Sequence, residues 1–151
     1  MRFKLLLLSI AVMIMSAKND DPKQSALPLE GTWRLISGTT ITKGDSVVTD
    51  YTKNQKMIKI INKTHFAFLR HDLQNGKGAD SAYESGAGTY KLSGNHYTEY
   101  LEYCNYREWE GKKFDFTITI KNDTLIQRGL EKVEEANVNR EIIERYVRVK
   151  K

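Results

Sequence analysis

The chain has 151 residues, enough for one domain with a buried core, and its 28% charged and 40% hydrophobic residues are ordinary for a globular protein. The formal charge of +5 is a small excess spread along the chain, which does not favour a nucleic-acid-binding protein. The sequence has one cysteine, Cys104, which excludes an internal disulfide, so stability must come from the core.

The first segment, residues 1–17, has the pattern of a secretory signal peptide. Arg2 and Lys4 form a basic start, residues 5–15 are almost entirely apolar, and small residues follow for cleavage. The apolar run is short for a membrane span, although an uncleaved anchoring helix is the alternative. We therefore expect an exported protein, periplasmic or secreted. No cysteine follows the signal closely, so we do not expect a lipoprotein.

Residues 18–29 are polar and contain both prolines of the chain, which predicts a disordered linker before a single domain at 30–151. Segments of strand length and composition then follow one another. They are residues 31–41, 56–62, 64–71, 86–92, 96–103, 113–120, 124–130 and 141–149. The pattern leaves open whether 47–51 is a short extension or part of a long connection. It predicts a loop at 73–85, and a charged loop or single helical turn at 131–140.

The sixth of these segments, residues 113–120, shows the clearest alternation. Phe114, Phe116 and Ile118 fall on one face and polar residues on the other, as in a half-buried strand. Eight strands joined mostly by short turns, without a long helix, predict an all-β fold in which an antiparallel sheet closes on itself. We expect an eight-stranded up-and-down barrel, because a sandwich would show longer crossing connections.

The two ends of the predicted barrel carry a familiar pattern. Gly31 and Trp33 open the first strand, and Arg145 lies in the last. This arrangement resembles the lipocalin and fatty-acid-binding-protein superfamily, the calycins. Segments 63–68, 88–92, 97–99 and 111–114 are similar to small exported lipocalin-like proteins of Bacteroidetes-type bacteria. The resemblance implies that Trp33 closes the base of the barrel and that Arg145 packs across it in a cation–π contact.

The last strand departs from the fatty-acid-binding branch, whose order is Arg-x-Tyr. Here Tyr146 and Arg148 share one face, while Arg145 and Val147 share the other. Alternation alone leaves open which arginine faces inward. The helical lid of that branch is also missing, so the lipocalin branch is closer.

The leading functional hypothesis is a non-catalytic barrel that binds a small, partly hydrophobic molecule in its cavity. The expected wall consists of Phe66, Phe68, Tyr90, Tyr97, Tyr103, Phe114, Phe116 and Ile118. The candidate polar groups are Arg70, Glu99 and Arg148. No cofactor is expected.

Catalysis and metal binding have little support in the sequence. Two of the three histidines, His65 and His71, lie about 20 Å apart along one strand, too far to share a metal. No nucleophile motif or phosphate loop occurs, so we do not expect an enzyme. An enzyme on such a barrel would show a polar cluster with perturbed pKa values inside. The alternative to a carrier is an envelope interaction module using an outer aromatic patch of Tyr100, Tyr106 and Trp109.

Overall fold

A computed structural model describes residues 27–79 and 81–150. The predicted signal peptide, 1–17, and most of the predicted linker lie outside the described residues. Within the described part, nine strands and one short 3-10 helix follow in chain order. They are β1 (Gly31–Thr42), β2 (Asp45–Asp50), β3 (Gln55–Ile61), β4 (His65–Asp72), β5 (Tyr83–Ser93), β6 (His96–Cys104), η1 (Arg107–Trp109), β7 (Lys113–Lys121), β8 (Thr124–Val133) and β9 (Val138–Arg148).

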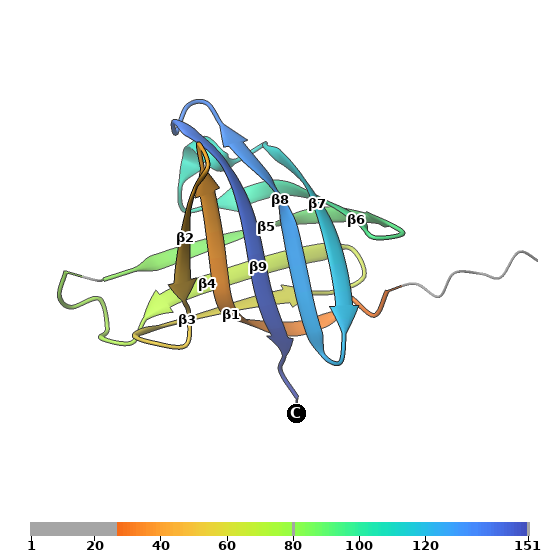
Figure 1. The fold of residues 1–151 in the computed structure, drawn as a ribbon, viewed down its shortest axis with the longest axis horizontal. Coiled ribbons are helices and arrows are strands. Elements are labelled where there is room, and N and C mark those ends of the chain that lie inside the picture. Colours follow the sequence, from red (N-terminus) through yellow and green to blue (C-terminus); the bar gives the residue numbers. More distant parts are fainter. Residues whose placement is uncertain (1–26, 80, 151) are drawn as a thin grey trace, which may run out of the picture.

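Eight of these strands form a closed antiparallel barrel, as the sequence predicts. Neighbours in the chain pair from β3 to β9, β1 pairs with β3, and β1 also pairs with β9 to complete the circle (Figure 1). Closure leaves no long unpaired edge around the barrel, which removes a common route to aggregation of β proteins.

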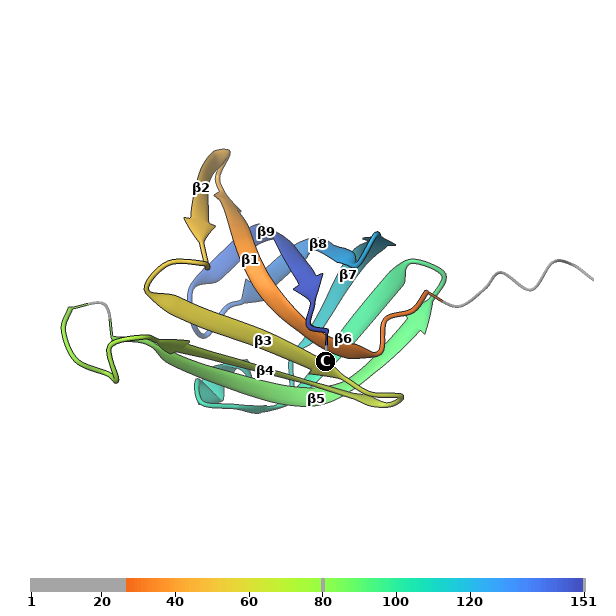
Figure 2. The same cartoon turned by 90° about the horizontal axis from the view of Figure 1, so that it is seen from below.

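The ninth strand, β2, resolves the segment that the sequence leaves open. β1 pairs with β3 only through residues 31–34, and its second half, from Ser37 onward, pairs with β2 on the same edge. Figure 2 shows the β1–β2 hairpin standing away from β3 at one end of the barrel. The two sides of the barrel therefore separate at that end.

Two predicted loops are shorter than expected. β5 begins at Tyr83, inside the predicted loop 73–85, and the predicted loop or helical turn at 131–140 is reduced to a turn at 134–137. There β8 and β9 continue as a hairpin, with Glu131 opposite Arg140 and an ion pair of 2.7 Å between them. Charged residues mark a loop only when they face solvent, whereas these two face each other across a ladder.

Two irregularities in the ladders change which residues face inward. The β1–β9 register shifts between Leu35 and Ser37, and the β5–β6 register shifts between Ala87 and Gly88. Each extra residue reverses the alternation beyond it. A side chain at Gly88 would place its Cβ 1.8 Å from the carbonyl oxygen of Tyr100, so the second irregularity requires glycine.

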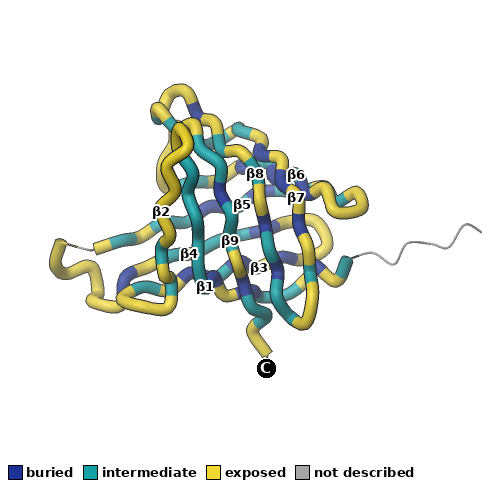
Figure 3. The backbone as a smooth tube through the Cα atoms, viewed as in Figure 1, coloured by how far each residue is buried: buried dark blue, intermediate teal, exposed yellow. Residues whose placement is uncertain are grey.

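The core fills the barrel from the end at which β1 begins. Figure 3 shows buried positions alternating with exposed ones along the strands. The most deeply buried large side chains are Trp33, Tyr97, Tyr146, Phe66, Leu35, Ile118 and Leu125. They occupy one end and the middle, which leaves the other end for a cavity.

Candidate functional site

The end of the barrel at which β1 begins and β9 finishes is sealed by Trp33. Its side chain is 0% exposed, and its Nε1 donates a 2.8 Å hydrogen bond to the carbonyl oxygen of Leu29. Leu29 belongs to the predicted linker, yet it is buried against the core. We call this region the closed end.

Arg148, not Arg145, lies over Trp33 at the closed end. Its guanidinium carbon is 4.0 Å from the indole centroid, and its terminal nitrogens donate to the carbonyl oxygens of Glu30 and Pro28. Arg145 is exposed. The prediction for Arg145 is therefore corrected, because the register places Arg148 directly opposite Trp33. Gly31 also belongs here, since a Cβ on it would meet a terminal nitrogen of Arg148 at 2.6 Å.

The opposite, open end contains a cavity of about 460 Å³. It lies between the second half of β1, the β8–β9 hairpin, η1, and the strand ends around the β4–β5 connection. Its apolar lining includes Met57, Phe68, Leu101, Trp109, Phe114, Phe116 and Ile142. Its charged lining consists of Lys59, Arg70, Glu84, Glu99, Glu108, Glu131, Arg140 and Glu144.

The floor of the cavity is a buried ion pair between Lys59 of β3 and Glu99 of β6. The Nζ of Lys59 also donates to the amide oxygen of Gln127, at 2.9 Å. Three aromatic rings, those of Phe66, Tyr97 and Tyr146, surround this ammonium at 5.5, 5.6 and 5.8 Å from their centroids. Burial of a charge is costly unless it is paired, so the floor is stable only as a complete set.

A second carboxylate, Glu144 of β9, lies beside this floor. Its Oε2 accepts a 2.6 Å hydrogen bond from the hydroxyl of Tyr146. Burial raises the pKa of Glu144 to about 7, although the positive charge of Lys59 acts in the opposite direction. Loss of hydration outweighs the neighbouring ammonium because Lys59 is already bonded to Glu99.

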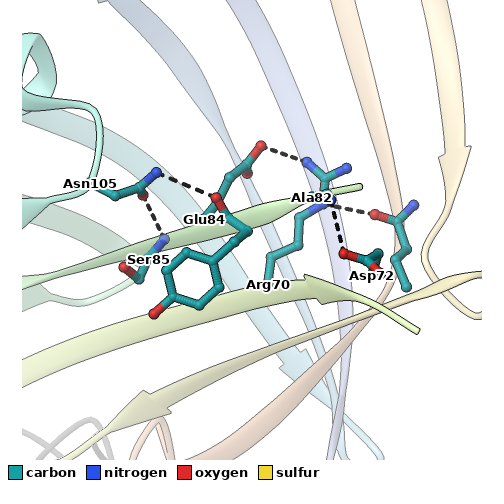
Figure 4. A network of polar contacts seen from close by, with 8 residues as sticks. Arg70, Asp72, Ala82, Glu84, Ser85 and Asn105 are labelled. Atoms are coloured by element: carbon teal, nitrogen blue, oxygen red, sulfur yellow. Dashed lines mark hydrogen bonds and ion pairs between the residues drawn. The ribbon is translucent and has the colours of Figure 1, made fainter. Parts of the chain in front are cut away.

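Two further ion pairs stand nearer the mouth of the cavity. Arg70 donates from Nη1 to Glu84 at 2.7 Å, as Figure 4 shows. Its Nε donates to the amide oxygen of Gln55, also at 2.7 Å. Arg140 donates from Nε to Glu131 at 2.7 Å. Burial nevertheless raises the pKa of Glu131, with Arg140 partly opposing the shift.

Asp72 holds the connection that follows β4. Its carboxylate accepts hydrogen bonds from the backbone N–H groups of Gln74, Gly76 and Ala82, and these bonds lower its pKa. Figure 4 shows this contact next to the Arg70–Glu84 pair. The connection between β4 and β5 is thereby tied to the strand that supplies Arg70.

The structure brings only part of the predicted site together. Phe68, Arg70, Glu99, Phe114 and Phe116 line the cavity. Phe66, Tyr97 and Ile118 are buried in the core and do not line it, and Tyr90 donates from its hydroxyl to the carbonyl oxygen of Asn62. Arg148 lies at the closed end.

Tyr103 is a clear correction, because its side chain is 66% exposed. Simple alternation puts it on the same face as Tyr97, but the irregularity in β6 intervenes and reverses the faces. Trp109, predicted for an outer patch, instead packs against Phe114 with ring centroids 5.7 Å apart and lines the cavity.

The cavity is also lined by residues that the sequence pattern did not predict, namely Lys59, Gln127, Glu131, Arg140 and Glu144. Lys59 had a usable signal, since it shares an alternating face with Met57 and Ile61, both buried. A lysine in an apolar register predicts a buried partner, and that partner is Glu99.

Metal binding and thiol chemistry have little geometric support. Within residues 27–79 and 81–150, no group of three His, Cys, Asp or Glu side chains is arranged to hold a metal ion. Cys104 lines the cavity as a free thiol, and burial raises its pKa, which disfavours the reactive thiolate. No helix in the described part of the chain is long and apolar enough to cross a membrane.

The fold and the site together define a closed, eight-stranded antiparallel barrel with one sealed end and a charged cavity at the other. No family model and no curated protein matches the chain. It is similar to a solved structure of an uncharacterized protein from Bacteroides eggerthii DSM 20697. The two share 14% identity, with a TM-score of 0.46, over 80% of this chain and 98% of that chain. An identity this low says nothing about function.

Proposed function

We propose that this protein is an exported lipocalin-like barrel that binds one small organic molecule in the open-end cavity without transforming it. The observation that carries the proposal is the cavity itself, about 460 Å³ in a barrel whose other end is sealed by Trp33. This volume falls within the range of small-molecule sites, and a site reached from one end only shields its ligand from water.

The lining of the cavity suits a molecule with both an apolar and a polar part. Rings of Phe68, Phe114 and Phe116 offer apolar area, whose burial stabilises by roughly 25 cal/mol per Å² before the ordering costs are subtracted. The ion pairs near the mouth and at the floor hold charged side chains in fixed positions. These side chains can therefore orient the polar part of a ligand. The lining therefore supports the expected partly hydrophobic ligand and adds that its polar part meets charged groups.

A catalytic role is the second candidate, because the cavity holds the kind of polar cluster that an enzyme would show. Glu144 has a pKa of about 7 and shares a hydrogen bond with Tyr146, so it is able to exchange a proton near neutral pH. We favour a carrier because the three histidines are exposed and the thiol of Cys104 has a raised pKa.

A third candidate is an interaction module, favoured by one outer face of the barrel. Leu69, Tyr83 and Tyr103 are 39%, 62% and 66% exposed on the neighbouring strands β4, β5 and β6. They border a shallow groove with Ala67 and Ala87. Replacement of Tyr103 by serine would abolish capture of an envelope protein under this hypothesis and leave cavity binding intact.

The test of the carrier proposal is native mass spectrometry of protein purified from its own exported fraction, followed by extraction and mass analysis of the extract. We expect a discrete extra mass that is released unchanged. The cavity-filling variant Thr40→Trp should lose it, whereas Thr119→Trp, which places the same ring on the outer face of β7, should keep it.

Protein at its bare mass in every preparation, with no uptake of an environment-sensitive dye, would contradict the carrier proposal. A released molecule that differs from the molecule added would favour the catalytic candidate instead.

A further inference from the structure

We propose that the cavity takes a small organic cation, an ammonium or amidinium group on an apolar body, with Glu144 as its counter-ion. This inference rests on the proposed function, since it names the class of ligand for the same cavity. It is carried by the balance of charges in the lining, by the position of one carboxylate oxygen, and by the rings that surround the remaining space.

The charged lining has more carboxylates than cations. Five glutamates face three basic residues, and three of these glutamates are matched one to one. The matched pairs are Lys59 with Glu99, Arg70 with Glu84, and Arg140 with Glu131. Glu108 is exposed on η1. Glu144 is thus the partly buried carboxylate of the lining that lacks an ion-pair partner among the described residues.

One oxygen of Glu144 is open to the cavity. Oε2 is bonded to the hydroxyl of Tyr146, while Oε1 accepts no hydrogen bond from the described residues. Among the described residues, Tyr97 Oη is the one fully buried side-chain nitrogen or oxygen that has no hydrogen-bond partner. Oε1 of Glu144 also has no partner, so it does not belong to the fully buried atoms and must be accessible. Because Glu144 lines the cavity, a donor on a ligand can reach this oxygen.

The neighbouring groups do not satisfy this carboxylate. Lys59 is committed to Glu99 and Gln127, so its ammonium is not free to move across. The titratable groups that bear on Glu144 come from four other places in the barrel as well as from β9. They are Tyr51, Lys59, Tyr97, Glu99, Glu131 and Tyr146. The two carboxylates among them repel negative charge and so favour a cation.

An anionic ligand fits the same cavity poorly. The arginines that would receive it, Arg70 and Arg140, are each bonded to a glutamate, and Arg70 also lies 5.5 Å from the ring centroid of Tyr51. An anion would have to displace these partners and would also meet Glu144. A cation would neutralise Glu144 and rest against aromatic faces, which attract positive charge.

The experiment compares three probes of similar shape and different charge by isothermal titration calorimetry on the whole mature protein. Phenethylamine is cationic, phenethyl alcohol is neutral and hydrocinnamate is anionic. We expect phenethylamine to bind at least about tenfold more tightly than the alcohol at pH 8, since a charge-assisted hydrogen bond to a buried carboxylate is worth one to two powers of ten. Hydrocinnamate should bind most weakly.

The pH dependence and one variant identify the residue. Phenethylamine stays protonated between pH 5.5 and 8, so its affinity should fall by up to about tenfold for each pH unit below 7 as Glu144 takes up a proton. Binding of phenethyl alcohol should not change. Glu144→Gln should bring the amine close to the alcohol, whereas Glu30→Gln, the same charge change at the closed end, should leave the preference intact.

The outcomes separate the two proposals. Equal or tighter binding of the alcohol or of hydrocinnamate, or an amine affinity that does not depend on pH, overturns the cationic ligand and leaves the carrier proposal standing. If none of the probes binds and no endogenous mass is found, both proposals fail. If Glu144→Gln does not fold, the pH dependence of phenethylamine affinity in the wild-type protein still decides between these outcomes.

Discussion

The two ends of this barrel each place a positive charge against aromatic rings, but they satisfy that charge in different ways. At the closed end Arg148 lies on Trp33, donates to backbone carbonyl oxygens of Glu30 and Pro28, and forms a longer, partly exposed ion pair of 3.4 Å with Asp123. On the floor of the open-end cavity Lys59 lies among three rings and bonds to a carboxylate, Glu99.

The difference shows what each end is built to do. Two neutral carbonyl oxygens and the partly exposed carboxylate of Asp123 satisfy Arg148, so its charge has partners within the closed end. The carboxylates of the open end come from separate strands and include Glu144, whose charge is left without a basic partner among the described residues. An end of this kind gains stability when something positive enters.

The largest expected effect comes from breaking the closed end. Trp33→Ala should cost about 3 to 5 kcal/mol of unfolding free energy, because it removes a fully buried ring and the platform for Arg148. Trp109→Ala at the open end should cost much less, since Trp109 is only partly buried. Urea denaturation of both variants measures the difference, and equal losses would refute the contrast between the ends.

Breaking the floor of the cavity should have the next largest effect. Glu99→Leu should destabilise the barrel by about 3 kcal/mol, because Lys59 is left buried without a carboxylate. The double variant Lys59→Met with Glu99→Leu should recover most of that loss, since buried pairs are replaced by apolar groups at little cost. Chemical denaturation of the single and double variants measures their unfolding free energies. A double variant as unstable as the single one would contradict a specific ion pair.

The pH dependence of stability sharpens the comparison further. The folded pKa of Glu144, about 7, lies above its ordinary value of 4.5, so the folded state binds a proton that the unfolded state has lost. Stability should therefore fall as pH rises from about 4.5 to 7, by roughly 2.5 kcal/mol. Glu144→Gln should remove this decline and raise the melting temperature at pH 8 but not at pH 4.5. Thermal unfolding measured across this pH range tests the prediction. The control is Arg148→Met at the closed end, which should keep the wild-type dependence of stability on pH.

The smallest expected effect concerns the boundary between the two ends. The hydroxyl of Tyr97 is buried and has no hydrogen-bond partner among the described residues. Tyr97→Phe should be neutral or stabilising by about 1 kcal/mol, because it removes an unsatisfied group and keeps the ring. Tyr146→Phe, which removes a hydroxyl bonded to Glu144, should destabilise. A loss in the first variant, measured by denaturation, would show that Tyr97 does have a partner.

The sequence predicted the barrel because strand alternation and short turns are local patterns, whereas the closing role of Trp33 was implied by the family resemblance. Strict alternation in β7 correctly placed Phe114, Phe116 and Ile118 inward, and all three are buried. The β4–β5 and β8–β9 boundaries were missed because strands near the mouth carry charged residues on their inner face. Hydrophobic periodicity does not identify such strands.

The predictions of site residues that were wrong depend on the register between paired strands, which the sequence of one strand does not show. Tyr103 faces outward because of one extra residue in β6, and that residue is recognisable only against β5. Arg148 rather than Arg145 meets Trp33 because β9 pairs with β1 in that register. Glu144 became a candidate only when its neighbours across the barrel were known, since its pKa is a property of the assembled cavity.

The pairing of β1 with β9 also governs how the barrel can fold. From β3 onward each strand finds its partner through a nearby turn, whereas Trp33 and Arg148 meet only when the two outermost strands of the described barrel come together. Contacts so distant along the chain are entropically expensive and slow to form. Sealing of the closed end is therefore a late event that requires nearly the whole domain. Before β9 is in place, the chain has its hairpins up to β7–β8 available but cannot close the barrel.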